Sequence, residues 1–234
     1  MTGAPVGAGD DAMGKVRAPR VRARRGEGDR LRDEILDAAE ALLIETADAE
    51  RVSIRAIGQM VGVSAPSIYR HFEDKDALLL AACERAYDRF DDYLIAESAD
   101  ASDPLQSIKA QAYAYIRFAL ANPGQYRILF MTPGAHVHPD LSDEDVFGEH
   151  SSIKGLVHLS EAVQAAIDDG LVAPIAPTSE IAVLLWSMVH GIASLRIAHP
   201  DMPWPDGERQ VDTLFKSLAV GLCTDEARLQ MGKE

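Results

Sequence analysis

Apolar residues recur at helical spacing along most of this chain of 234 residues. Between residues 30 and 46 they form one stripe, and acidic side chains take the opposite face. A longer stripe covers residues 74–97, and similar segments follow at residues 104–122, 123–131, 150–169, 178–199 and 207–224. No period-two strand of any length interrupts them. With two shorter helices between residues 53 and 72, the pattern predicts an all-α protein of about nine helices.

Residues 53–75 carry those two short helices, separated by a three-residue turn. Ser53 can cap the first helix, and Ile54, Ile57 and Met60 place apolar side chains on one side of it. Gly62 lies where the chain must reverse, because glycine adopts a positive φ without steric cost. Two helices joined at a steep angle by such a turn form a helix-turn-helix, whose second helix fits the major groove of DNA.

The second short helix has its own start and buried face. Ser64 can cap it, and Pro66 is tolerated in its first turn, where no intrahelical N–H is needed. Ile68 and Phe72, four residues apart, bury one face. Gly58, four residues before the turn glycine, predicts a close approach of the two helices that a side chain would prevent.

These residues resemble a known family. The sequence SIYRHF at residues 67–72, followed by DKDALL at residues 74–79, resembles the recognition helix and the start of the fourth helix of the tetracycline-repressor (TetR) family. The resemblance covers about residues 30–80. It implies a three-helix DNA-binding domain at residues 29–75.

The resemblance also implies roles for single side chains. Tyr69, His71 and Lys75 are expected at phosphates, whereas Arg70 and the small residues of the first turn are expected at base edges. The full set expected at the DNA interface is Ser53, Arg55, Ser64, Ala65, Pro66, Ser67, Tyr69, Arg70, His71 and Lys75.

The net charge of −14 would argue against DNA binding if it were spread evenly. Residues 1–75 hold 12 Lys and Arg against 13 Asp and Glu, whereas residues 76–234 hold 11 against 24, so the acidity lies in the second part. Residues 1–28 form a basic arm, expected to be disordered, in which Lys15 and the arginines up to Arg25 have no acid between them. Two alternatives stay open for the arm, which either contacts the DNA backbone or minor groove or is a solvated tail.

A second resemblance marks the rest of the chain. WSMVHG at residues 186–191 resembles the Trp-x-x-x-His-Gly motif of one branch of TetR C-terminal domains, and GQYRILF at residues 124–130 agrees with that branch. The resemblance implies that residues 76–225 form one helical ligand-sensing and dimerisation domain, followed by a tail at residues 226–234. It also implies that the helix at residues 74–97 transmits the ligand signal.

Apolar and aromatic side chains of this domain suit a pocket for a lipophilic effector, such as an acyl chain, an aromatic compound or a drug. The alternative for each of them is an ordinary place in the core. The candidates are Tyr113, Phe118, Tyr126, Phe130, Trp186, Met188 and His190.

Small residues late in the chain predict a homodimer. Gly191, Ala193 and Ser194 would let a partner helix approach closely, and Leu214, Leu218 and Gly221 offer a similar face on the last helix. Two such helices from each subunit make a four-helix interface. A dimer also follows from the resemblance, because paired recognition helices must reach half-sites about one DNA turn apart.

One loop carries possible metal ligands. His136 and His138, with acidic residues after them, could ligate a divalent ion, although a solvated loop is the alternative. Cys83 and Cys223 form no metal motif and suit small buried positions better than a redox switch. We find no spacing typical of a catalytic triad or a phosphate loop, so we expect no enzyme and no cofactor. A metal-dependent helical enzyme using this loop and an interaction protein with a vestigial helix-turn-helix remain the alternatives.

The chain lacks both a run of eighteen apolar residues and the apolar stretch of a secretory signal, so we expect a cytoplasmic protein without a membrane span. The sequence therefore predicts a sequence-specific DNA-binding transcriptional regulator. Its expected form is a homodimeric repressor on a pseudo-palindromic operator, released by a small lipophilic ligand.

Overall fold

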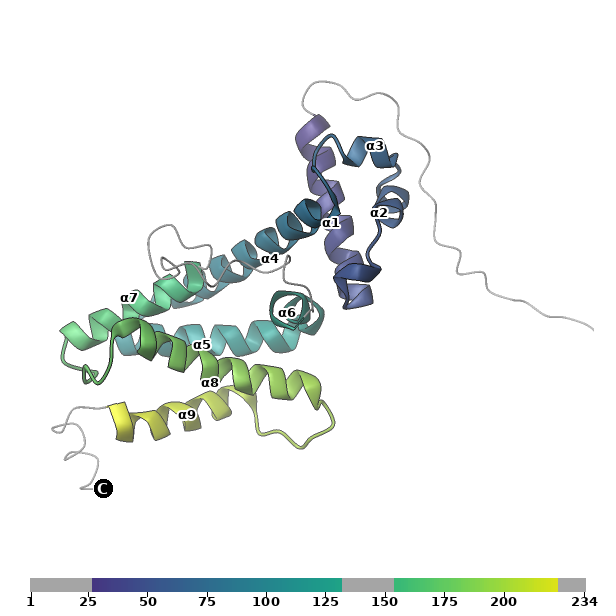
Figure 1. Ribbon diagram of the computed structural model, residues 1–234. Helices are drawn as coiled ribbons and strands as arrows, with labels where there is room; N and C mark the ends of the chain where they lie inside the picture. Colours follow the sequence, from purple (N-terminus) through teal and green to yellow (C-terminus); the bar gives the residue numbers. More distant parts are fainter. Residues whose placement is uncertain (1–26, 132–153, 223–234) are drawn as a thin grey trace, which may run out of the picture.

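One long helix joins two groups of shorter helices in the computed structural model, which describes residues 27–131 and 154–222 (Figure 1). The elements of these ranges are, in order, α1 (Glu27–Thr46), the short 3₁₀ helix η1 (Ala49–Arg51), α2 (Ile54–Val61), α3 (Ala65–Ile68), α4 (Lys75–Ser98), α5 (Pro104–Ala121), α6 (Pro123–Phe130), α7 (Lys154–Asp168), α8 (Thr178–Ala198) and α9 (Gly207–Leu222). The predicted all-α fold of about nine helices is confirmed for this part of the chain. The predicted loop at residues 132–148, the tail at residues 226–234 and nearly all of the basic arm lie outside the described residues.

Side-chain caps set the start of several helices. Ser53 accepts a hydrogen bond from the backbone N–H three residues further on, at 3.1 Å. Asp74 and Asp103 do the same at 2.7 and 2.9 Å, at the starts of the helices predicted at residues 74–97 and 104–122. Ser64 is the N-cap residue of α3, as predicted, but its side chain makes no capping hydrogen bond, since its hydroxyl lies 3.2 Å from the hydroxyl of Ser67.

A hydrophobic core lies under the first three helices. It takes side chains from α1, α2, α3, the first turns of α4 and one residue of α6, and its larger members are Ile35, Leu36, Leu43, Val52, Ile57, Ile68, Phe72, Leu78, Leu79 and Ile128. Met60 was predicted on the buried side of α2 but is 47% exposed. The buried stripe of α2 continues from Ile57 to Val61, four residues on, and leaves Met60 outside.

The long helix α4 belongs to two cores. Its first turns, with Leu78 and Ala82, pack into the core of the N-terminal helices. Its later turns, with Phe90 and Leu94, pack into the core of the second domain. Figure 1 shows α4 running from the N-terminal group into the lower group of helices, so the two domains share one rigid element.

In the second domain α5 packs against α4, α7, α8 and α9. Among the described helices, α8 is long and apolar enough to cross a membrane, judged by its length and composition alone. The sequence analysis, which predicted no membrane span, did not identify α8 as such a helix. The helix α8 is apolar on two faces. One face, with Ile181 and Leu185, is buried in the core, and the other exposes Val183, Leu184 and Leu195.

Candidate functional site

Two glycines shape the turn between α2 and α3. Gly62 has a φ of 80°, as predicted for a residue that must reverse the chain. A Cβ on Gly58 would lie 2.8 Å from the carbonyl oxygen of Val63. The close approach predicted at Gly58 is therefore made mainly by the backbone of the turn, which hydrogen-bonds back to the Gly58 carbonyl.

The helix α3 presents a polar outer face over a buried inner one. Its four residues are prolonged by one more turn, in which the Phe72 N–H donates to the Ile68 carbonyl over 3.1 Å, and both of these side chains are buried. On the outside, the Arg70 guanidinium donates to the hydroxyl of Ser67 over 2.8 Å. Tyr69 is 50% exposed beside them. Such a face can reach a groove without disturbing the core.

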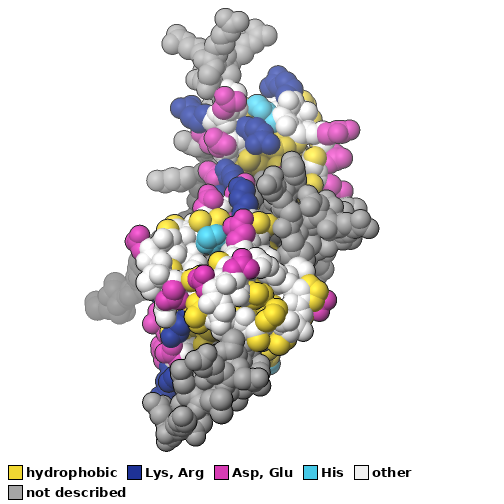
Figure 2. Space-filling view, turned by 90° about the vertical axis from the view of Figure 1, so that its left-hand side faces the viewer, with side chains coloured by type: hydrophobic (Ala, Val, Ile, Leu, Met, Phe, Trp, Pro, Cys, Tyr) yellow, Lys and Arg dark blue, Asp and Glu magenta, His cyan; other side chains and the backbone are white. Residues whose placement is uncertain are grey.

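Lys75 lies beside this face, at the first residue of α4. Its ammonium donates to the Ala49 carbonyl over 3.2 Å and lies 4.0 Å from a carboxylate oxygen of Glu50. The remaining predicted DNA contacts of α2 and α3 are exposed or half-buried on the same domain: Ser53, Arg55, Ser64, Ala65, Pro66 and His71. In the face seen in Figure 2, Lys and Arg side chains gather over this domain at the top, beside a histidine and flanked by acidic side chains.

A cavity of about 430 Å³ lies inside the second domain. It is lined by side chains of α4 to α9, most of them apolar or aromatic, including Tyr87, Phe90, Leu94, Ile108, Tyr115, Phe130, Leu156, Trp186 and Phe215. This size and lining are typical of a site for a small lipophilic molecule.

Three predicted ligand residues, Phe130, Trp186 and His190, line this cavity. The other four do not. Tyr113 points toward α9, where its hydroxyl donates to Asp212 over 2.5 Å. Phe118 packs against Phe90, with ring centroids 4.9 Å apart. Tyr126 is fully buried behind the wall and Met188 is half-buried on α8.

His190 is held by two tyrosines. Its Nδ1 lies 2.8 Å from the hydroxyl of Tyr126 and 3.0 Å from that of Tyr115. Burial lowers the pKa of His190, so the imidazole is neutral near pH 7. Each tyrosine hydroxyl can donate to Nδ1 or accept from it, according to which ring nitrogen carries the proton. Tyr126 thus supports the cavity wall without lining it.

Two buried polar residues that the sequence prediction missed also line the cavity. Asp91 is 1% exposed and Gln111 is 4% exposed. Burial raises the pKa of Asp91 to about 7, although the backbone N–H groups of Lys154 and Gly155 lower it in part. A signal existed in the sequence, since Asp91 stands in the apolar stripe of its helix between Tyr87 and Leu94.

The residues predicted at the dimer interface differ in how far they are exposed on the surface of the subunit. Ala193 is fully buried in the core of its own subunit, so it is not available to a partner. Leu214 lines the cavity. Gly191 is half-buried, and a Cβ there would meet no atom within 4 Å in the described part of the chain. Ser194 and Leu218 are also half-buried, and Gly221 lies in the last turn of α9.

The possible metal ligands His136 and His138 lie outside the described residues, as does Cys223. Within the described ranges, His, Cys, Asp and Glu form no cluster of three that could hold a metal ion. Cys83 is fully buried, and burial with the nearby Glu40 and Glu84 raises its pKa to about 12. Its thiol therefore stays protonated, as expected of a small core residue.

The exposed recognition helix and the cavity-bearing second domain define a helix-turn-helix regulator. Residues 35–82 match the family model described as bacterial regulatory proteins of the tetR family. Residues 108–222 match the model described as the tetracyclin repressor-like C-terminal domain. Because the two matches fall on both domains, the chain belongs to the TetR family of DNA-binding transcriptional regulators and is not an enzyme.

Among curated proteins, the nucleoid occlusion factor SlmA of Haemophilus ducreyi is 31% identical over 96 residues, which make up 41% of this chain and 48% of that protein. The chain thus spans about half the length of the curated relatives it matches. Among solved structures, a protein of unknown function from Rhodococcus sp. RHA1 is 25% identical, with a TM-score of 0.64 over 83% of this chain and 96% of that one.

A second similar structure is the complex of SmeT with triclosan. It is 20% identical, with a TM-score of 0.61 over 85% of this chain and 94% of that one. SmeT is the repressor of the Stenotrophomonas maltophilia multidrug efflux pump SmeDEF. At this identity the likeness establishes the shared fold alone.

Proposed function

We propose that the protein is a repressor that binds a pseudo-palindromic operator as a homodimer and is released by a lipophilic effector. The observation that carries this proposal is the position of α6. This short helix contacts the DNA-binding domain on one side and the cavity on the other, so it can couple the two sites.

The side of α6 toward the DNA-binding domain is closely packed. Ile128 is 2% exposed and belongs to the core of the N-terminal helices. Gln125 donates from its amide to Glu40 of α1 over 2.9 Å. A Cβ on Gly124 would lie 2.7 Å from the side chain of Ile44, also on α1. A displacement of α6 would therefore displace α1.

The other side of α6 faces the cavity. Leu129 and Phe130 line it, and the hydroxyl of Tyr87 in α4 donates to the Leu129 carbonyl. A ligand in contact with Phe130 would act on α4 and α6 together. Both helices enter the core of the DNA-binding domain, so this ligand would favour one arrangement of the recognition helices over another. To change operator occupancy completely, it must prefer the released state by about 5.5 kcal/mol.

An exposed stripe on α8 supports the homodimer. Leu184, Met188, Gly191 and Leu195 follow one another at helical spacing, and Leu184 and Leu195 are 42% and 51% exposed. Glycine within this stripe would allow close approach of the same helix from a second subunit. An interface between identical patches gives two-fold symmetry, which matches a palindromic operator.

The effector is a small lipophilic molecule in this proposal, because the cavity is lined mainly by apolar and aromatic groups. The Trp-x-x-x-His-Gly branch fits as well, since Trp186 and His190 both line the cavity. The triclosan complex of SmeT supports an effector of this kind in a protein of the same fold. As a regulator of transcription, the protein acts in the cytoplasm.

Fluorescence anisotropy of the full chain with DNA from upstream of its own gene, against scrambled DNA at several salt concentrations, tests the proposal. We expect sequence-preferring binding by two chains, with an affinity that falls as salt rises. Extracts of the purified protein are analysed by mass spectrometry for a bound effector, because a ligand retained through purification would release DNA. If the protein is free of ligand and no genomic fragment binds, the proposal is wrong and the helix-turn-helix is vestigial.

A further inference from the structure

A carboxylate lies in the wall of the cavity without a directly paired cation among the described residues. Asp91, in the middle of α4, is 1% exposed and lines the cavity. Its Oδ2 atom is buried and has no hydrogen-bond partner among the described residues. A buried carboxylate oxygen in this state is unfavourable unless a donor or a cation reaches it.

The neighbours of Asp91 hold its other oxygen and leave this one free. The backbone N–H groups of Lys154 and Gly155, at the start of α7, hydrogen-bond to the carboxylate. A Cβ on Gly155 would lie 2.6 Å from Oδ1, so the absence of a side chain at Gly155 lets the carboxylate lie this close to the backbone of α7. The Lys154 ammonium is engaged elsewhere, 2.5 Å from Asp88. The positive charge of Lys154 lowers the pKa of Asp91 in part, but its ammonium pairs with Asp88 and not with Asp91.

A second unpartnered group belongs to another residue that lines the same cavity. The amide nitrogen of Gln111, in α5, is buried and lacks an acceptor among the described residues. It is a donor, whereas Asp91 Oδ2 is an acceptor. The remaining wall is aromatic and aliphatic, with Phe90, Phe130 and Trp186 among its rings.

We propose that the cavity binds a lipophilic organic cation, such as an aromatic or alkyl amine, whose positive group pairs with Asp91 and whose acceptor atom, where it has one, faces Gln111. The apolar body of the ligand fills the aromatic part of the cavity, and aromatic faces add favourable contacts to a cation. A carboxylate ligand would bring a second negative charge to Asp91 and is disfavoured. The assignment deepens the proposed function, on which it rests, by naming the chemical class of the effector.

The test compares three probes with the same apolar body: phenylbutylamine, phenylbutanol and phenylbutyrate. Their affinities for the full chain are measured by isothermal titration calorimetry at a pH above 7, where Asp91 is mostly ionised. We expect the ammonium to bind about tenfold tighter than the alcohol, with the carboxylate weakest. If all three probes bound with equal affinity, or the carboxylate bound tightest, the assignment would be overturned, and no substitution in the protein would be needed to show this.

Two variants then locate the preference. In Asp91→Asn we expect the ammonium to bind no tighter than the alcohol. Asp92→Asn is the matched control, because it removes the same charge from an exposed neighbour on the same helix. If Asp91→Asn kept the preference, or Asp92→Asn lost it, the ammonium would be attracted by the general negative charge and the assignment would be wrong.

DNA anisotropy on the same samples separates this assignment from the proposed function. Operator binding together with no ammonium preference overturns the cation site and leaves the regulator proposal standing. An ammonium preference that depends on Asp91, in a ligand-free protein that binds no genomic fragment, overturns the regulator proposal and leaves the site standing.

Discussion

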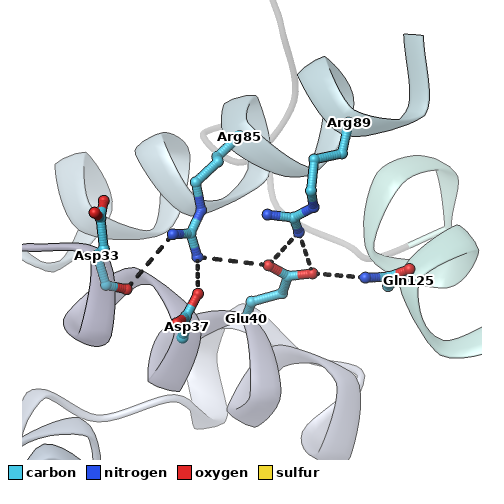
Figure 3. A network of polar contacts seen from close by, with 6 residues as sticks. All are labelled: Asp33, Asp37, Glu40, Arg85, Arg89 and Gln125. Atoms are coloured by element: carbon cyan, nitrogen blue, oxygen red, sulfur yellow. Dashed lines mark hydrogen bonds and ion pairs between the residues drawn. The ribbon is translucent and has the colours of Figure 1, made fainter. Parts of the chain in front are cut away.

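Gln125 donates to Glu40 over 2.9 Å and so joins α6 to α1 across the two domains (Figure 3). Arg89 of α4 donates to the same carboxylate, 2.6 Å from Oε1. Arg85, one turn earlier, bonds to Asp37 over 2.6 Å and lies 3.8 Å from Glu40. A carboxylate that is only 7% exposed thus holds three helices together.

The coupling between Glu40 and Gln125 is measurable in a double-mutant cycle. We expect the effects of Glu40→Ala and Gln125→Ala on the free energy of unfolding to be non-additive by about 1 to 2 kcal/mol. Each single substitution already removes the hydrogen bond to the buried charged group, so the double mutant loses no further hydrogen bond between these two residues. Chemical denaturation of the four proteins gives this value. The same cycle with the exposed Gln106 in place of Gln125 should be additive, and an additive Gln125 cycle would contradict a direct link.

The contact between Gly124 and Ile44 predicts a conditional effect. A Cβ on Gly124 would lie 2.7 Å from Ile44 Cγ2, so Gly124→Ala must displace α6 or turn the Ile44 side chain. We expect a loss of about 1 kcal/mol in the free energy of unfolding, since the Ile44 side chain is 40% exposed and can partly yield. In an Ile44→Ala background the same change should cost nothing. Thermal melts of the four proteins test this, and an equal loss in both backgrounds would exclude the contact as the cause.

The exposed stripe of α8 predicts where the dimer can be broken. Leu195→Glu places a charge on a residue that is 51% exposed in the isolated subunit, so we expect an intact fold but a shift toward monomers. Sedimentation equilibrium measures this shift. Ile175→Glu is the matched control, because Ile175 is 58% exposed in the segment before α8. A Leu195→Glu protein that still dimerises like the control would remove α8 from the interface.

Two basic residues of the DNA-binding domain are expected to act differently. Lys75→Ala should weaken binding to all sequences and lower the slope of log affinity against log salt by about 0.9, as expected for one lost phosphate contact. Arg70→Ala should weaken operator binding by about 1 to 3 kcal/mol and reduce the preference over scrambled DNA. Anisotropy titrations at several salt concentrations separate these outcomes. If Lys75→Ala left both affinity and slope unchanged, its phosphate role would be refuted.

Local features of the helix-turn-helix could be predicted because neighbouring residues determine them. The positive φ of Gly62 and the cap at Ser53 depend on a few adjacent positions. Met60 shows the limit, because both Met60 and Val61 fit an apolar stripe, and only packing decides which is buried.

The cavity depended on long-range packing and was predicted less well. Helical spacing alone does not show which aromatic side chains of α5 face the cavity. Tyr113 hydrogen-bonds to Asp212 of α9, whereas Tyr115 lines the cavity. Asp91 was missed because a carboxylate in a charged helix is usually solvated. Its position in the apolar stripe between Tyr87 and Leu94 indicates burial only once α7 is known to pack against α4.

Asp91 also predicts a pH-dependent gain in stability on substitution. Burial raises its pKa from 3.8 to about 7, so between these values the folded chain binds more protons than the unfolded chain. The free energy of unfolding therefore falls as pH rises through this window, and the unfavourable charge is fully present above pH 7. We expect Asp91→Asn to be more stable than the original chain by roughly 1 to 3 kcal/mol above pH 7, and about equal to it near pH 4.

Urea denaturation of both proteins across this pH range measures the difference. The lowered pKa of His190 adds its own pH dependence, but that contribution is common to both proteins and cancels. Asp92→Asn, on the exposed side of α4, should show no comparable gain. A carboxylate that lowers stability inside an otherwise apolar cavity is expected where a ligand uses the charge. If Asp91→Asn were instead less stable at every pH, Asp91 would serve mainly to hold the start of α7.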